Sequence, residues 1–122
     1  MSNFTKGRLG EDLAAEHYMQ NGYETLERNW RWSNKGEIDI IAYSKSENII
    51  AVCEVKTRKE ASLTAPCEAV NAAKIRKLKI LAEVYMLKNK PGCTAAVRFD
   101  VAEVTVKADG RIADINILYN AF

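Results

Sequence analysis

Residues 36–42 read Gly-Glu-Ile-Asp-Ile-Ile-Ala, and residues 52–56 read Val-Cys-Glu-Val-Lys. Both stretches are dominated by Ile, Val and small apolar residues, which predicts two strands with little exposure to water. Each nevertheless carries charged residues, although Asp and Glu are depleted from strands because their side chains are poorly placed on a half-buried pleat. These stretches decide the fold because they predict two strands of one sheet and mark where polar groups enter it.

The charged residues of the two stretches fall on defined faces. Side chains alternate along a strand, so Glu37 and Asp39 share one face of the first strand. Glu54 and Lys56 likewise share one face of the second. A polar loop of residues 44–48 separates the strands, and two strands joined by so short a loop are most simply an antiparallel hairpin. In such a hairpin Asp39 and Glu54 can converge.

The rest of the chain supplies further elements on either side of this hairpin. We expect a helix over residues 6–20, strands over 23–32, 37–43 and 49–57, a helix over 66–88, and strands over 95–106 and 112–118. Thr5 is the expected cap of the first helix and Asn21-Gly22 its stop, while Pro66 opens the second helix and Pro91-Gly92 ends it. This order predicts one α/β domain over residues 1–122, with a mixed sheet covered by helices on both faces.

Composition excludes several classes of protein. The chain has 122 residues, of which 48% are hydrophobic, but no apolar run approaches the roughly 20 residues of a membrane span. Charges near the N-terminus argue against a secretory signal. Cys53, Cys67 and Cys93 are odd in number and lack metal-ligand spacing, which predicts reduced thiols in a cytoplasmic protein. Because His17 is the only histidine, any catalysis must depend on carboxylates and lysines, with or without a metal, rather than on a His-based site.

The distribution of charge is more informative than the net charge of +2. Residues 71–90 hold six basic side chains against one acidic one, Glu83. The six are Lys74, Arg76, Lys77, Lys79, Lys88 and Lys90. A second basic group, Arg28, Arg31 and Lys35, precedes the acidic strand. Basic flanks around a carboxylate cluster suit a polyanionic substrate, although the alternative is that these lysines only solvate a helix face.

Two carboxylates held close together in an apolar setting repel each other, and a divalent cation removes that cost. Mg²⁺ prefers hard oxygen ligands, typically one or two carboxylates with water and a substrate phosphate. A lysine two residues from a ligand can orient the attacking water or stabilise charge on the phosphate. The pattern therefore indicates metal-assisted hydrolysis of a phosphodiester. The alternative is that Glu54 and Lys56 lie on an exposed edge and that Asp39 pairs with an arginine. The combined pattern, an acidic residue in one strand followed by E-x-K in the next, is more specific and favours a metal site.

These residues resemble the YraN-like family of small bacterial proteins, usually placed in the PD-(D/E)xK nuclease superfamily beside archaeal Holliday-junction resolvases. The further matching pieces are Gly7-x-x-Gly10-Glu11, Arg28-Asn29-x-Arg31, Pro66-x-Glu68-Ala69-Val70 with Lys74, and Arg98-Phe99-Asp100-Val101. The resemblance covers nearly the whole chain and implies a restriction-endonuclease-like three-layer α/β/α domain with a central mixed β-sheet. Ile38 stands where the superfamily name has proline, which is normal for this family.

The resemblance also implies roles for individual residues. Asp39 and Glu54 would ligate Mg²⁺, for which Mn²⁺ can substitute, with the carbonyl of Val55 as a third ligand. Lys56 would be the catalytic lysine. Glu11, on the first helix, would be an accessory ligand or would hold a water molecule.

Basic residues around the site are the expected contacts to nucleic acid. They are Arg31, Arg58, Lys74 and Lys77. Two alternatives stay open: Glu37 organises Arg31 or Arg58, and Lys74 forms an ion pair with Glu68 or Glu37. Gly7 and Gly10 are expected to allow close helix packing. Arg98 and Asp100 are expected to form an internal pair.

Two classes of function fit these observations. The first is a metal-dependent nuclease acting on DNA, including branched or recombination intermediates; an RNA-processing nuclease would share the same site. The second is a non-catalytic nucleic-acid-binding or scaffold protein that retains the fold, since fold does not fix function. Resolvase-like enzymes often cut as homodimers, and the apolar tail of residues 115–122 suits either a dimer interface or a core strand.

Overall fold

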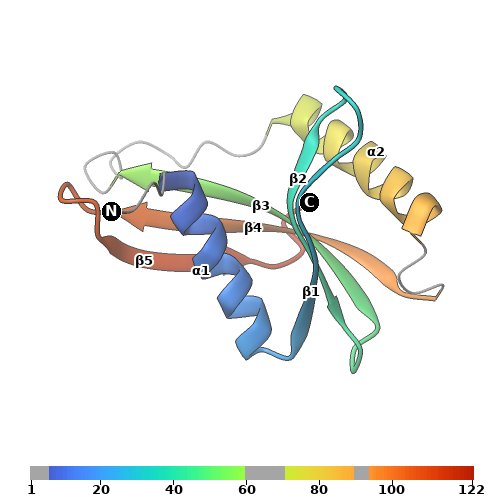
Figure 1. The fold of residues 1–122 in the computed structure, drawn as a ribbon, viewed down its shortest axis with the longest axis horizontal. Coiled ribbons are helices and arrows are strands. Elements are labelled where there is room, and N and C mark those ends of the chain that lie inside the picture. Colours follow the sequence, from blue (N-terminus) through green and yellow to red (C-terminus); the bar gives the residue numbers. More distant parts are fainter. Residues whose placement is uncertain (1–5, 60–70, 90–93) are drawn as a thin grey trace.

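The computed structural model describes residues 6–59, 71–89 and 94–122 (Figure 1). Its elements are α1 (Lys6–Gln20), β1 (Tyr23–Arg31), β2 (Glu37–Ser44), β3 (Ile49–Lys59), α2 (Ala72–Asn89), β4 (Ala96–Val106) and β5 (Ile112–Leu118). The order is the predicted one, and the bounds of α1 and of every strand agree with the prediction to within two residues.

The start of α2 differs from the prediction. The predicted start at Pro66 lies outside the described residues, as do the cap at Thr5 and the stop at Pro91-Gly92. Asn71, predicted to be helical, instead precedes the helix, and its Oδ1 accepts the backbone N–H of Lys74 at 2.9 Å. Asn is a preferred N-cap because its side chain satisfies such an N–H group, so the helix begins after it. No helix in the described part of the chain is long and apolar enough to cross a membrane.

The five strands form one mixed sheet in the order β1-β2-β3-β4-β5. Neighbouring strands are antiparallel except for β3 and β4, which are parallel. Parallel neighbours cannot be joined by a tight turn, so the chain crosses over between them, and α2 lies in that crossover.

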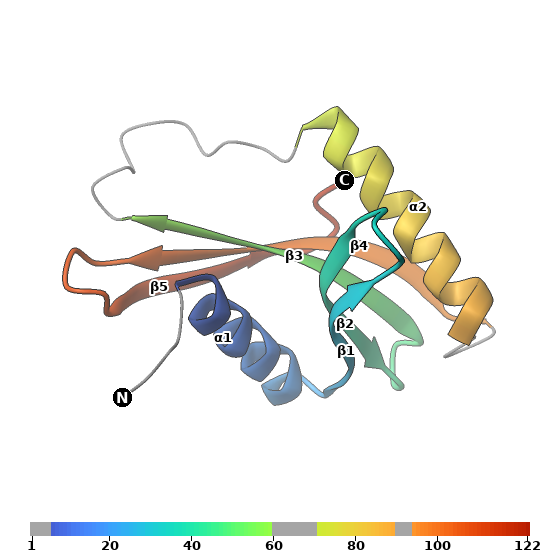
Figure 2. The same cartoon turned by 45° about the horizontal axis from the view of Figure 1, so that its top comes forward.

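Two apolar clusters cover opposite faces of the sheet, with α1 below and α2 above in Figure 2. Alternate residues of β3 enter the two clusters: Ala51 and Cys53 pack with α1, whereas Ile50 and Val52 pack with α2. From α1 the first cluster takes Ala14, Ala15 and Tyr18. From α2 the second takes Leu78, Leu81, Ala82 and Tyr85. The predicted three-layer α/β/α arrangement is therefore confirmed.

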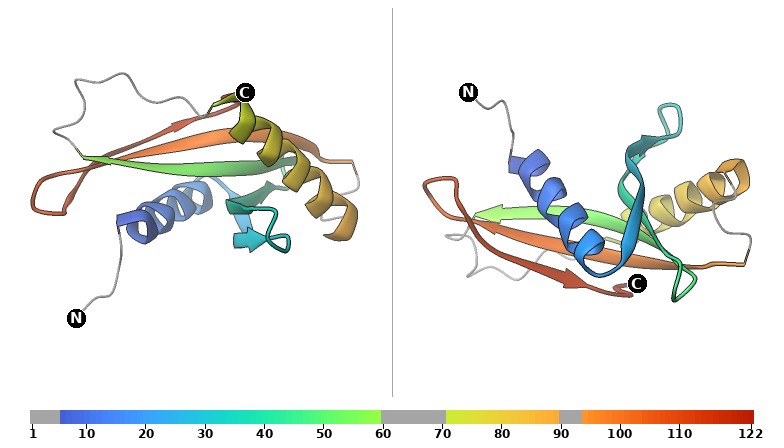
Figure 3. Two further views of the ribbon diagram at one scale, coloured as in Figure 1. Left: turned by 90° about the horizontal axis from the view of Figure 1, so that it is seen from above. Right: turned by 60° about the horizontal axis from the view of Figure 1, so that its bottom comes forward.

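The sheet divides at the start of β2. The pairing of β2 with β3 ends at Ile40 and Cys53. Beyond this point β2 stays paired only with β1, through Ile38 and Glu37, while β3 continues beside β4 to Lys59. Figure 3 shows β1 and β2 curving away from the other three strands. We call this divergence of residues 37–39 from residues 54–56 the fork.

Gly10 brings the first turns of α1 close to the fork. A Cβ at this position would lie 2.9 Å from Thr57 Oγ1 and 3.3 Å from Val104 Cγ2. The helix backbone therefore rests almost directly on β3 and β4, which only glycine permits. The expectation that Gly10 allows close packing is confirmed, and the same contact sets the position of Glu11.

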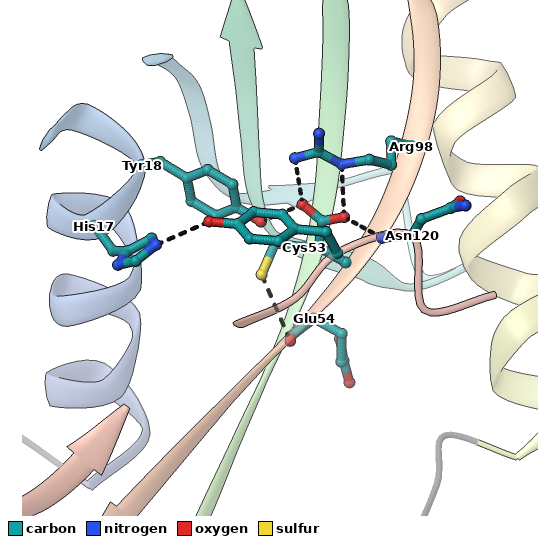
Figure 4. Close-up of polar contacts among 8 residues, drawn as sticks. His17, Tyr18, Cys53, Glu54, Arg98 and Asn120 are labelled. Atoms are coloured by element: carbon teal, nitrogen blue, oxygen red, sulfur yellow. Dashed lines mark hydrogen bonds and ion pairs between the residues drawn. The ribbon is translucent and has the colours of Figure 1, made fainter. Parts of the chain in front are cut away.

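Next to the fork, a buried polar network joins α1, β4 and the segment after β5, centred on Asp100, which pairs with Cys53 of β3 (Figure 4). Asp100 is fully buried and accepts two hydrogen bonds from Arg98, from Nε and Nη2, both at 2.8 Å. It also accepts the Tyr18 hydroxyl at 2.6 Å and the backbone N–H of Asn120 at 2.9 Å. The predicted internal pair of Arg98 and Asp100 is thus confirmed. Four donors on one carboxylate satisfy a charge that would otherwise be costly to bury.

Candidate carboxylate site at the fork

Asp39 lies on β2 one residue beyond the last pair that this strand makes with β3. Its Oδ2 accepts the backbone N–H of Val55 at 2.8 Å. The side chain thus replaces the carbonyl that β2 would have offered had the two strands stayed paired. The carboxyl group of Glu54 interacts with that of Asp39, so the two acidic side chains lie near each other across the fork.

The electrostatic setting of Asp39 opposes its ionisation. Burial raises the pKa of this carboxyl to about 7, and the negative charges of Glu54 and Glu11 act in the same direction. The N–H of Val55 acts against them because it stabilises the ionised form. A carboxyl that titrates near neutrality between other carboxylates is a common sign of a functional site, because a bound cation or proton must offset the repulsion.

Glu54 is buried, with 5% of its surface exposed, and is held by two ammonium groups. Its Oε2 lies 3.2 Å from Nζ of Lys74 on α2 and 3.7 Å from Nζ of Lys56 on the same strand. The alternative that Glu54 faces solvent is therefore wrong, whereas Lys56 is 40% exposed on a part of β3 that is paired with β4 alone. Among the described residues the partner of Lys74 is Glu54 and not the predicted Glu37, while the other predicted partner, Glu68, lies outside the described residues.

Glu11 approaches the fork from the α1 side of the sheet. Arg28 of β1 holds it there, with Nη2 3.8 Å from Glu11 Oε1 and 2.6 Å from Asp12 Oδ1. Among the described residues, no three His, Cys, Asp or Glu side chains form a group that could hold a metal. Glu11 therefore adds charge near Asp39, while the pair that faces across the fork consists of Asp39 and Glu54.

A cleft of about 210 Å³ opens beside Asp39, between the start of β2 and α2. It is lined by Gly36, Glu37, Asp39, Lys74, Lys77, Leu78 and Leu81. Gly36 has φ of 141°, and a Cβ there would lie 2.7 Å from Lys77 Cε and 3.1 Å from Leu81 Cδ1. The absence of a side chain at Gly36 therefore lets α2 approach β2 closely. As a result Lys74 and Lys77 line the same cleft as Asp39.

The remaining predicted contacts to nucleic acid lie around this site. Arg31 Nε is 3.0 Å from Glu37 Oε2, which confirms the alternative that Glu37 organises Arg31. Arg58 is half-buried on β3, two residues beyond Lys56. Whether Arg31 and Arg58 contact nucleic acid stays a prediction.

Arg28 is the residue of this site whose role sequence reasoning missed. In the sequence Arg28 is one of several basic residues before the acidic strand, and no pattern indicates that it forms ion pairs with Glu11 and Asp12. The hydrophobic pattern fixes which face of α1 is buried, but the contact depends on where β1 passes the helix. The spacing of residues along the chain does not predict where β1 passes α1.

Comparison with known proteins gives a consistent result. The model of a family described as "Uncharacterised protein family UPF0102" matches residues 10–104. A UPF0102 protein of Caldicellulosiruptor saccharolyticus is 41% identical over 116 residues, which is 95% of each chain. One from Alkaliphilus metalliredigens is 43% identical over 116 residues, 95% of this chain and 96% of the relative. One from Dictyoglomus thermophilum is 36% identical over the full length of both chains. None of these names states an activity.

Proposed function

The chain belongs to the uncharacterised protein family UPF0102, and from this starting point we propose that it is a metal-dependent nuclease that hydrolyses phosphodiester bonds in DNA. The observation that supports the proposal is the pairing of Asp39 and Glu54 across the fork, beside a cleft lined by lysines. Branched or recombination intermediates are the proposed substrates, as the resemblance to the PD-(D/E)xK nucleases and resolvases implies.

The oxygen groups at the fork fit Mg²⁺ or Mn²⁺. Asp39 and Glu54 supply carboxylate oxygens, and the carbonyl of Val55 can supply a third ligand, a set of the kind that Mg²⁺ accepts together with water. The raised pKa of Asp39 indicates that the site gains from added positive charge. A bound metal would polarise a phosphoryl oxygen and make a water molecule more acidic.

The other residues have complementary roles in this proposal. Lys56 lies beside Glu54 and stabilises the charge that develops on the phosphate. Lys74 and Lys77 line the cleft and hold the phosphodiester backbone there, with Arg31 and Arg58 farther along the same strands. Glu11 holds a water molecule on the α1 side of the fork.

The second candidate is a nucleic-acid-binding or scaffold protein without catalytic activity. The same fork argues against it, because ionised Asp39 lines the cleft and repels phosphate unless a cation lies between them, whereas Glu54 is already paired with Lys74 and Lys56. A pure binding protein gains nothing from that arrangement. An RNA nuclease shares the site, and the choice between RNA and DNA depends on experiment.

Cleavage with matched variants tests the proposal. The substrates are duplex, single-stranded, flapped and four-way-junction DNA and one RNA, each with Mg²⁺ or Mn²⁺. We expect cleavage by wild type and by Glu37→Gln, a control that also lines the cleft but whose carboxylate pairs with Arg31. Asp39→Ala and Glu54→Gln should lose at least about a hundredfold in rate, because each loses a metal ligand.

The results separate the candidates. Cleavage that persists in both carboxylate variants would come from a contaminant and would refute the proposal. Salt-sensitive DNA binding that needs no metal, with no cleavage of any substrate, would establish the scaffold function. We also propose that the protein cuts junctions as a homodimer, since two strands need two sites; a monomer on the junction in analytical ultracentrifugation would refute this.

A further inference from the structure

One buried carboxylate oxygen at the fork has two positively charged neighbours. Lys74 Nζ lies 3.2 Å from Glu54 Oε2, and Lys56 Nζ lies 3.7 Å from the same oxygen. The Lys74 contact is the shorter, although Lys56 is on the same strand as Glu54. A side chain from a different element thus provides the closer partner of this carboxylate.

The two lysines differ in how they are attached. Lys56 extends from β3 beyond the end of its pairing with β2, where the strand is paired with β4 alone, and its side chain is 40% exposed. Lys74 lies in the first turn of α2, where its backbone N–H is bound by Asn71 Oδ1. The Lys74 side chain is 41% exposed, so its ammonium can turn toward water without breaking any apolar packing of the core.

We propose that Lys74 is a built-in competitor of the metal ion: it neutralises Glu54 when no metal is bound, and the metal displaces it. This inference rests on the proposed function, because it assumes that Glu54 is a metal ligand. An ammonium group and a divalent cation cannot both lie against one buried oxygen without strong mutual repulsion. Binding of the metal therefore releases the lysine.

The released ammonium has a defined place to go. Lys74 lines the cleft that also contains Asp39 and Lys77, so its side chain already reaches both Glu54 and the cleft. Turned into the cleft, it adds a positive charge where the phosphate backbone would lie. Metal binding would thus strengthen nucleic-acid binding, and linkage requires the reverse effect as well.

Mn²⁺ binding in the absence of nucleic acid tests the inference without using activity. Calorimetric titration would compare wild type with Lys74→Met, Lys74→Arg and Lys77→Met. Lys77 lines the same cleft and carries the same charge, so its variant controls for the general loss of positive charge. We expect Lys74→Met to bind Mn²⁺ roughly tenfold more tightly, the size expected for losing one competing charge-assisted contact to Glu54. Lys74→Arg and Lys77→Met should stay within about threefold of wild type.

Each result leads to a distinct conclusion. Tighter binding by Lys74→Met alone, or binding by this variant where wild type binds too weakly to measure, would support the competition. Equal affinity in wild type, Lys74→Met and Lys77→Met would overturn it and leave the proposed metal site intact. An equal gain in both methionine variants would reduce the effect to net charge and would also overturn it. If no variant binds Mn²⁺, the proposed function fails and the inference fails with it.

Discussion

At the scale of single residues, Asp39 lies in a setting that opposes its ionisation. It is half-buried, it points toward Glu54, and its one backbone hydrogen bond only partly offsets these effects. Residues that lower the stability of the folded protein in this way are typical of functional sites, because a bound ligand offsets the unfavourable electrostatic energy.

We expect Asp39→Asn to stabilise the metal-free protein at neutral and alkaline pH. The folded-state pKa of about 7 lies above the unfolded value of 3.8, so between these values the folded state holds a proton that the unfolded state has lost. Stability therefore falls as pH rises through this window. Asparagine keeps an oxygen for the Val55 N–H but has no charge, so the gain should be near zero at about pH 4 and about 2 kcal/mol at about pH 8.

Urea unfolding of wild type and Asp39→Asn across this pH range, with a chelator present, measures the difference. Asp109→Asn is the control, because Asp109 forms an exposed pair with Arg111 and should change stability by no more than about 0.5 kcal/mol. A gain that is the same at all pH values would mean that ionisation of Asp39 is not the cause.

At the scale of elements, the cleft exists because α2 can approach the start of β2. Gly36 makes this approach possible, with a φ of 141° and no side chain to meet Lys77 and Leu81. We expect Gly36→Ala to lower the free energy of unfolding by about 2 to 3 kcal/mol, from backbone strain and crowding together.

Gly110→Ala separates these two causes. Gly110 also has positive φ, 88°, but a Cβ there would meet nothing within 4 Å, so its variant has strain alone. Thermal unfolding of both variants should show the larger loss for Gly36→Ala. Equal losses would mean that α2 is not packed against Gly36 as closely as the structure shows.

The elements were largely predictable from sequence, and the contacts between them were not. Strand period and a short loop were enough to bring Asp39 and Glu54 together, because both are local rules and the register follows from them. The partner of Lys74 depends on how α2 lies across the sheet. That position is set by Gly36 and by packing between segments far apart in sequence, so the spacing of residues along the chain does not predict it. The start of α2 was missed for a more local reason, since Asn71 is itself a recognisable N-cap.

At the scale of the whole molecule, the two faces of the sheet serve different purposes. The face toward α2 contains the cleft and the lysines, whereas the face toward α1 holds the network around Asp100. The pair of Arg98 and Asp100 was predictable from their spacing on one strand. The participation of Tyr18 and Asn120 was not, because it brings both ends of the described chain onto β4.

This network should stabilise the whole molecule, because Tyr18 ties α1 to an inner strand and Asn120 ties the C-terminal segment to the same carboxylate. We expect Tyr18→Phe to lower the free energy of unfolding by about 2 kcal/mol, since a fully buried carboxylate loses one charge-assisted donor. Tyr119→Phe is the matched control: its hydroxyl bonds to His17 at an exposed position, so its loss should be no more than about 0.5 kcal/mol. Urea unfolding followed by circular dichroism measures both, and a single transition in Tyr18→Phe would show that α1 unfolds together with the sheet. Equal losses in the two variants would mean that the buried bond to Asp100 is worth no more than an exposed one, and that apolar packing of α1 on the sheet is sufficient to hold the layers together.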